Sequence, residues 1–151
     1  MKKTYLFAGI LLVFLVGSFF VFNTKETSAG ATATYYKSIS CGCCDVHSKY
    51  LDSKGFDIKV NNLQDVTAIK SQFGIPRDLE SCHTAVIDGY FVEGHIPVEA
   101  INKMLSEKPD IKGIAMPGMP SGSPGMPGAK TGDFVIYAVN NDGTSYEFMR
   151  I

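Results

Sequence analysis

Hydrophobic and polar positions follow two different periods in the chain from residue 35 onward. Short runs of β-branched and aromatic residues predict strands, whereas apolar residues three or four positions apart predict helices. Gly55 and Gly74 each follow a predicted helix, and Asp88-Gly89 is typical of a tight hairpin turn. The predicted elements are strand 35–39, helix 45–54, strand 56–60, helix 65–73, strands 84–87 and 91–93, helix 97–108, and strands 134–139 and 144–149.

This order predicts an α/β fold: a thioredoxin-like mixed sheet with flanking helices, plus a C-terminal β-hairpin. Residues 116–128 are rich in Gly, Pro and Met and predict a loop. In a thioredoxin-like fold, the turn after the first strand lies beside the turn before the hairpin. Those two turns carry Cys-Gly-Cys-Cys at 41–44 and Ser-Cys-His at 81–83. We therefore expect all four cysteines of the chain at one end of the sheet.

The N-terminal part of the chain carries an excess of apolar residues. Two lysines precede an apolar run over residues 5–22, which is long for a cleaved signal and just long enough to span a bilayer. Positive charges before the run and none directly after it favour export of the rest of the chain. We expect residues 1–22 to be a signal sequence or an N-terminal membrane anchor, 23–34 a linker, and 35–151 one folded domain.

The expected location of that domain is extracytoplasmic, on the periplasmic or cell-surface side. Ala31-Thr32-Ala33 resembles a small-residue cleavage site, so an anchored form and a processed form both stay open. The formal net charge is −1, and the basic residues form no run. The sequence therefore lacks the electrostatic footprint of a nucleic-acid-binding protein, and we predict no nucleic-acid partner.

Four cysteines in an exported chain would by default form two disulfides. Cys41 and Cys44 also have the C-x-x-C spacing of thiol–disulfide exchangers, with Cys43 as a competing partner. A helix N-terminus stabilises thiolate, which is the form that binds soft metals. Three alternatives follow: a soft-metal site, thiol exchange, or structural disulfides that pair Cys41 with Cys44 and Cys43 with Cys82. We favour the metal site.

Two other metal chemistries fit the cysteine spacing poorly. The chain has no C-x-x-C-H run, which excludes haem attachment. A closed zinc site usually has two separated C-x-x-C pairs, and only one occurs here.

Methionine and histidine extend the set of candidate ligands. Met116, Met119 and Met126 lie in the Gly/Pro-rich loop, and thioethers bind Cu(I) but do not suit Zn(II). The alternative is that these methionines only pack onto the sheet. His83 follows Cys82 directly, and His95 is either a ligand or a hydrogen-bonded turn residue. His47 shares a helix face with Cys43 and Cys44, although an exposed histidine is the commoner outcome on a short helix.

These residues form an ordered set of motifs that resembles the CopG-like proteins, a family of small exported copper-resistance proteins with a thioredoxin-like fold and a C-x-C-C motif. The motifs are CGCC at 41–44, SCHTAV at 81–86, VEGHIP at 92–97, PGMP at 117–120 and GSPGM at 122–126. The resemblance covers essentially all of residues 35–151. Members often carry a tryptophan in the first helix near the site, whereas this chain has no tryptophan and places His47 there.

The resemblance implies a metal-binding domain for copper, preferably Cu(I), with a role in copper resistance and in Cu(I)/Cu(II) redox handling. The residues that match the family's motif positions are Cys41, Cys43, Cys44, Cys82, His83, His95, Met119 and Met126. Because thiolate sulfur can bridge Cu(I) ions, we predict more than one copper per chain. Expected partners are copper ions, copper-exporting or electron-donating proteins, and the membrane through the N-terminal segment.

Two other functions stay open at this stage. One is an extracytoplasmic thiol–disulfide oxidoreductase that uses Cys41 and Cys44, although Ser81-Cys82-His83 replaces the cis-proline that such exchangers carry before the hairpin. The other is an interaction module held together by zinc or disulfides. Fold alone does not decide among these functions; the site must.

Overall fold

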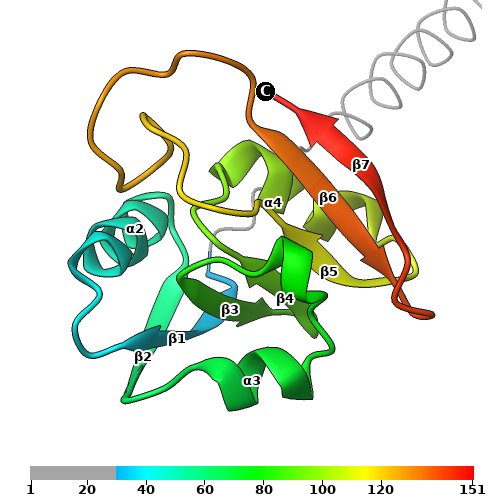
Figure 1. Cartoon of the computed structure of the whole chain (residues 1–151), viewed down its shortest axis with the longest axis horizontal. Coiled ribbons are helices and arrows are strands. Elements are labelled where there is room, and N and C mark those ends of the chain that lie inside the picture. The colour runs from blue at the N-terminus through cyan, green and yellow to red at the C-terminus, as the bar shows by residue number, and fades with distance from the viewer. Residues whose placement is uncertain (1–29) are drawn as a thin grey trace, which may run out of the picture.

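The computed structural model describes residues 30–151, so the predicted signal or anchor segment lies outside the described residues. Seven strands form one mixed sheet in the order β2-β1-β3-β4-β5-β6-β7 (Figure 1). The strands are β1 Thr32–Ser38, β2 Asp57–Leu63, β3 His83–Ile87, β4 Tyr90–Glu93, β5 Ile111–Ala115, β6 Val135–Asn140 and β7 Ser145–Arg150. The helices are α2 Gly42–Ser53, α3 Thr67–Gln72, the 3-10 helix Arg77–Leu79, and α4 Val98–Glu107.

The first half of the sheet has the predicted connections, and the mixed α/β fold is confirmed. Strand β1 pairs in parallel with β2 and antiparallel with β3, so β1–α2–β2 is a strand–helix–strand unit. The β3–β4 hairpin turns at Asp88 and Gly89, whose φ angles of 50° and 85° are both positive, as a primed turn requires. Within residues 30–151, no helix is both long and apolar enough to cross a membrane.

Strand β5 is absent from the sequence prediction. It has only five residues, Gly113 lies at its centre, and a register shift interrupts its pairing with β6, so no clear period of two is visible. Because β5 pairs in parallel with β4, helix α4 is the crossover between them. Strand β5 also pairs with β6, so the predicted C-terminal hairpin β6–β7 continues the main sheet.

Several predicted boundaries also differ from the structure. Strand β1 begins at Thr32, inside the predicted linker, and Ala33 is already buried in the core. Helix α2 begins at Gly42 instead of Asp45, which places Cys43 and Cys44 inside its first turn. The sequence prediction had placed the cysteines in a turn before the helix.

The sheet has a hydrophobic core on each face because its buried strand residues alternate. Val92 and Ile114 belong to the larger core, which helices α2 and α4 cover, whereas their neighbours Phe91 and Ala115 belong to the smaller one. The smaller core includes residues next to α3 and the 3-10 helix, and Figure 1 shows α3 on the opposite side of the strands from α2. Helix α2 is thereby fixed with its N-terminus at one end of β1 and β3.

Candidate metal centre

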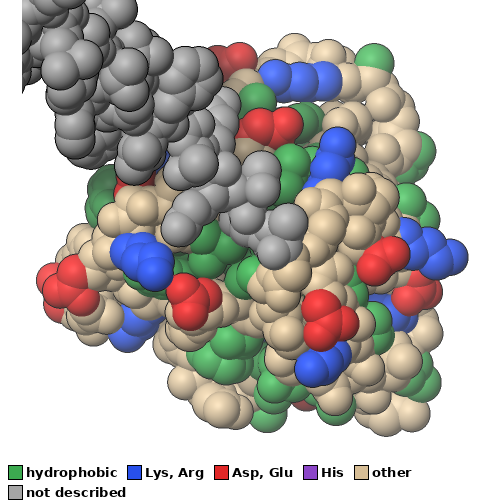
Figure 2. Space-filling model, turned by 180° about the vertical axis from the view of Figure 1, so that it is seen from behind, with side chains coloured by type: hydrophobic (Ala, Val, Ile, Leu, Met, Phe, Trp, Pro, Cys, Tyr) green, Lys and Arg blue, Asp and Glu red, His purple; other side chains and the backbone are tan. Residues whose placement is uncertain are grey.

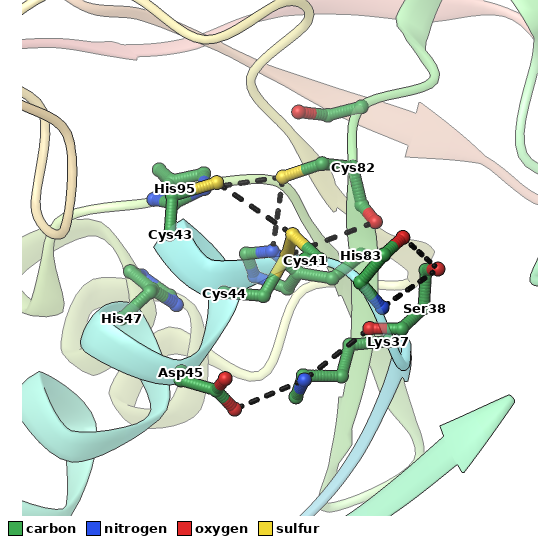
Figure 3. The surroundings of a disulfide bond; sticks show 12 residues. Lys37, Ser38, Cys41, Cys43, Cys44, Asp45, His47, Cys82, His83 and His95 are labelled. Atoms are coloured by element: carbon green, nitrogen blue, oxygen red, sulfur yellow. Dashed lines mark hydrogen bonds and ion pairs between the residues drawn. A yellow bond between two sulfur atoms is a disulfide. The ribbon is translucent and has the colours of Figure 1, made fainter.

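The four cysteines meet where helix α2 begins and strand β3 begins (Figure 3). Cys41 is the N-cap residue of α2, and Cys43 and Cys44 follow in its first turn. Cys82 directly precedes β3, whose first residue pairs with the end of β1. The four Sγ atoms all lie within 4.8 Å of one another. The predicted convergence of the two cysteine segments is therefore present in the structure.

Two of these sulfur atoms are joined in a disulfide between Cys41 and Cys44. Cys43 and Cys82 are free, partly buried thiols, and Cys43 Sγ lies 3.6 Å from Cys41 Sγ. The sequence had allowed two disulfides, and the structure contains only the first of them within the described residues. The disulfide sulfurs and the two free thiols lie close enough together to be candidate ligands of one metal site.

Two histidines extend the thiol cluster toward the interior. Cys82 Sγ lies 3.1 Å from His95 Nε2 and 3.4 Å from His83 Nδ1. Together with Cys44, these three residues form a second group whose ligand atoms are all within 4.8 Å of one another. His83 Nε2 is buried and has no hydrogen-bond partner, so one polar atom of this group is unsatisfied. The two groups share Cys44 and Cys82.

His47 differs from the expected exposed helix residue because it is completely buried. Its Nδ1 lies 3.1 Å from the Tyr35 hydroxyl and its Nε2 lies 3.1 Å from the carbonyl oxygen of Ile96. That carbonyl can only accept, so Nε2 carries the proton and Nδ1 accepts from Tyr35. Both ring nitrogens are engaged, which makes His47 a support of the site rather than a ligand. The face in Figure 2 shows no histidine among the described residues.

Comparisons with known proteins give the chain a family. A family model described as "Protein of unknown function, DUF411" matches residues 79–126. Two solved structures, titled "Copper resistance protein copG- Form 2" and "Form 1", are each 37% identical to the chain, with TM-scores of 0.76 and 0.75. Each alignment covers 81% of this chain and 98% of the other. This chain belongs to the CopG family. No curated protein matches it.

The family match includes much of the site of this CopG-family chain. Residues 79–126 contain Cys82, both site histidines and the methionine-containing loop, whereas the first cysteine segment precedes that match. The predicted resemblance is thus confirmed.

Burial favours the neutral forms of Cys82, His83 and His95 in the CopG-family site. It raises the pKa of Cys82 to about 12, and the neighbouring Cys43 raises this pKa further. Burial lowers the pKa of His83 and of His95. Cys82 is therefore a thiol in the metal-free site, and a metal ion that binds it must displace its proton.

The loop methionines occupy three different environments. Met116 is buried in the larger core, so it packs rather than serving as an accessible thioether. Met119 is half exposed, and Met126 is partly buried. Met119 follows Gly118, whose carbonyl oxygen accepts a hydrogen bond from Ser81 Oγ at 2.5 Å, next to Cys82. Met126 lies two residues after Pro124, whose carbonyl oxygen is 2.6 Å from His95 Nδ1.

The sequence prediction missed a buried ion pair beneath Cys82. The Glu93 carboxylate accepts hydrogen bonds from Lys70 Nζ, from the Thr84 hydroxyl at 2.5 Å and from the Ser81 backbone N–H at 2.5 Å. Burial raises the pKa of Glu93, and the Lys70 cation opposes that effect. The available signal was a lysine on the apolar face of the predicted helix 65–73. These hydrogen bonds hold Ser81, the residue that precedes Cys82.

The buried histidines predict a dependence of stability on pH. Burial lowers the pKa of His47 to about 4, whereas an unfolded histidine titrates near 6.5. The stability that neutral His47 provides is therefore present above pH 6.5 and is lost as the pH falls toward 4, by about 3 kcal/mol for this residue. His83 and His95 act in the same direction. Urea denaturation of the metal-free protein should show this loss, and a His47→Gln variant should show less of it. Equal stability at pH 7 and pH 4.5 would contradict the prediction.

Proposed function

We propose that this chain binds copper as Cu(I) and serves copper resistance on the extracytoplasmic side of the membrane. The observation that carries the proposal is the set of four sulfur atoms of Cys41, Cys43, Cys44 and Cys82 within 4.8 Å of one another. Thiolate sulfur is a soft ligand that suits Cu(I). The two CopG structures that the chain resembles are titled copper resistance proteins, which supports copper over other soft metals.

The overlap of the two ligand groups supports more than one copper ion per chain. One group contains four cysteines, and the other combines Cys44 and Cys82 with His83 and His95. Shared thiolates can bridge neighbouring Cu(I) ions. Cys43 and Cys82 are outside the disulfide, so both thiols can lose a proton and bind a metal ion. A zinc site would use one set of four ligands and hold a single ion.

The disulfide supports a redox role in copper handling. Reduction of the Cys41–Cys44 bond consumes two electrons and two protons and yields two thiols. Oxidation of two Cu(I) ions to Cu(II) supplies two electrons, so the two half-reactions balance without a further reductant. The reverse direction oxidises the two thiols and returns two Cu(I) ions. Exchange with a separate electron-donating protein would set the direction.

The proposal also gives roles to the methionine-containing loop and to the N-terminal segment. Met119 and Met126 act as thioether ligands that receive or release Cu(I) at the edge of the site, because each lies within two residues of a backbone contact to it. Residues 1–22 export the chain or anchor it in the membrane. A copper-exporting protein is the expected recipient of the metal.

Metal analysis of the reduced full-length protein tests this function. The protein is prepared without oxygen, offered both Cu(I) and Zn(II), and examined for metal content and by X-ray absorption at the copper edge. We expect more than one Cu(I) per chain with sulfur ligands, and loss of this copper in a Cys43→Ser/Cys82→Ser variant. A Ser40→Ala variant beside Cys41 is the control and should bind normally. Bound zinc in place of copper, or no bound metal, would overturn the proposal.

A second function is favoured by one observation, the disulfide of Cys41 and Cys44 at the start of helix α2. This is the spacing of a thiol–disulfide oxidoreductase. The described residues contain no cis peptide bond, and a free Cys82 thiol stands beside the pair, so the usual exchanger geometry is not present. Insulin reduction that depends on Cys41 and Cys44 and is unaffected by copper would support the exchanger instead.

A further inference from the structure

The loop of residues 116–128 contacts the candidate metal centre through its backbone. Pro124 O lies 2.6 Å from His95 Nδ1. A carbonyl oxygen can only accept a hydrogen bond, so Nδ1 must carry the proton. In the neutral ring, Nε2 is then left with a lone pair, and this atom lies 3.1 Å from Cys82 Sγ. The thiol can donate to Nε2 in the metal-free protein.

We propose that the Pro124 carbonyl is an outer-shell partner of the metal site and fixes the tautomer in which His95 Nε2 is free to bind metal beside Cys82. The inference rests on the proposed copper site and adds a positioning residue to it. Histidine ligands commonly donate their second ring N–H to a carbonyl or carboxylate, and loss of that partner costs about 10–100-fold in metal affinity.

Gly125 explains how the carbonyl can approach so closely. Its φ is +85°, and a Cβ added there would lie 2.8 Å from the backbone nitrogen of His47 and 3.0 Å from the carbonyl oxygen of Cys43. The loop therefore rests directly against the first turns of helix α2, with no room for a side chain. A second anchor, from Ser81 Oγ to Gly118 O at 2.5 Å, holds the other part of the loop.

The other two histidines lack this arrangement, and the structure describes all three. His47 has both nitrogens engaged, with Tyr35 and with the Ile96 carbonyl, and neither faces a thiol. His83 faces Cys82 through Nδ1 at 3.4 Å, but its Nε2 has no partner to set the tautomer. His95 alone pairs a carbonyl on one nitrogen with a candidate metal ligand on the other.

The tautomer can be measured directly in the reduced, metal-free, full-length protein. Long-range nitrogen–proton NMR spectra of 15N-histidine-labelled protein distinguish which ring nitrogen carries the proton, and a His95→Gln variant assigns the signals. We expect His95 to be protonated at Nδ1 alone. A proton on Nε2, or a mixture of tautomers, would overturn the inference whether or not the protein binds copper.

A Gly125→Ala variant tests the contribution of the loop to metal binding. We expect a mixture of His95 tautomers and a Cu(I) affinity lower by about 10–100-fold, measured by competition with a Cu(I) chelator. Gly89→Ala is the matched control, because Gly89 has the same φ of +85° but no atom within 4 Å of an added Cβ. It shares the backbone strain and should keep wild-type affinity.

The outcomes separate this inference from the proposed function. If wild-type protein binds Cu(I) but Gly125→Ala binds as tightly as Gly89→Ala, the positioning role is wrong and the copper site stands. If Gly125→Ala does not fold, the tautomer of His95 in the wild-type protein tests the inference, which requires a proton on Nδ1 alone. If wild-type protein binds no Cu(I), the proposed function fails, and the role of Pro124 as an outer-shell partner fails with it, even with the expected tautomer.

Discussion

Replacing Cys82 by serine is expected to lower the Cu(I) affinity of the reduced protein by more than the 10–100-fold typical of an outer-shell substitution. Cys82 belongs to both ligand groups, and its sulfur lies within 3.4 Å of nitrogen atoms of two histidines. Serine removes the soft ligand from both groups at once. Competition with a Cu(I) chelator measures the affinity, and metal analysis measures the number of ions held.

Cys43→Ser is the comparison that makes this result specific. Cys43 belongs only to the group of four cysteines, so the group with two histidines keeps all its ligands in this variant. We expect Cys43→Ser to lose part of the bound copper and Cys82→Ser to lose nearly all of it. Equal losses in the two variants would show that the second group does not bind metal independently.

The Lys70→Met variant is expected to destabilise the protein by about 3–5 kcal/mol at neutral pH, because it leaves the Glu93 carboxylate buried without a counter-charge. Both side chains of this pair are almost fully buried. Burial already raises the pKa of Glu93 with Lys70 present, and removing the cation raises it further. The loss of stability in Lys70→Met should therefore grow as the pH rises through the pKa of Glu93 in the folded protein. It should vanish below the pKa of Glu93 in the unfolded chain, where the carboxyl group is protonated in both states. Urea denaturation at several pH values measures it.

Two variants control for other effects of this substitution. Lys70→Met/Glu93→Gln removes both charges and should recover much of the stability lost at neutral pH. Because this variant keeps all three histidines, their contribution to the pH dependence of stability should be unchanged. Lys103→Met breaks an exposed pair with Glu107 and should cost at most about 1 kcal/mol. A Lys70→Met variant as stable as Lys103→Met would mean that water reaches Glu93.

The sequence predicts those parts of the fold and site that depend on local pattern. The two turns that carry the cysteines follow from strand–helix order, and Asp88-Gly89 fixes the hairpin by its positive φ angles. The meeting of Cys82 with the helix cysteines then follows from the topology alone. The mixed sheet is likewise visible in the alternation of short strand and helix segments.

Features set by tertiary packing could not be predicted in this way. Strand β5 contains Gly113, whose added Cβ would lie 2.2 Å from the Phe91 carbonyl oxygen, so close backbone packing rather than side-chain pattern defines it. His47 is polar in sequence, but its two hydrogen-bond partners come from β1 and from the segment after β4. The contact of Pro124 with His95 joins residues 29 positions apart through a backbone atom, which no residue type encodes.

The cysteines that meet at the site are separated by very different lengths of chain. Cys41 and Cys44 are separated by three positions, whereas Cys44 and Cys82 are 38 positions apart. Closing the short loop costs far less chain entropy than closing the long one. In an oxidising compartment, the bond between Cys41 and Cys44 can therefore form on a chain that has not yet folded. A newly made molecule would then start without two of its four thiols, and this bond would have to be reduced before all four sulfur atoms could bind copper as thiolates.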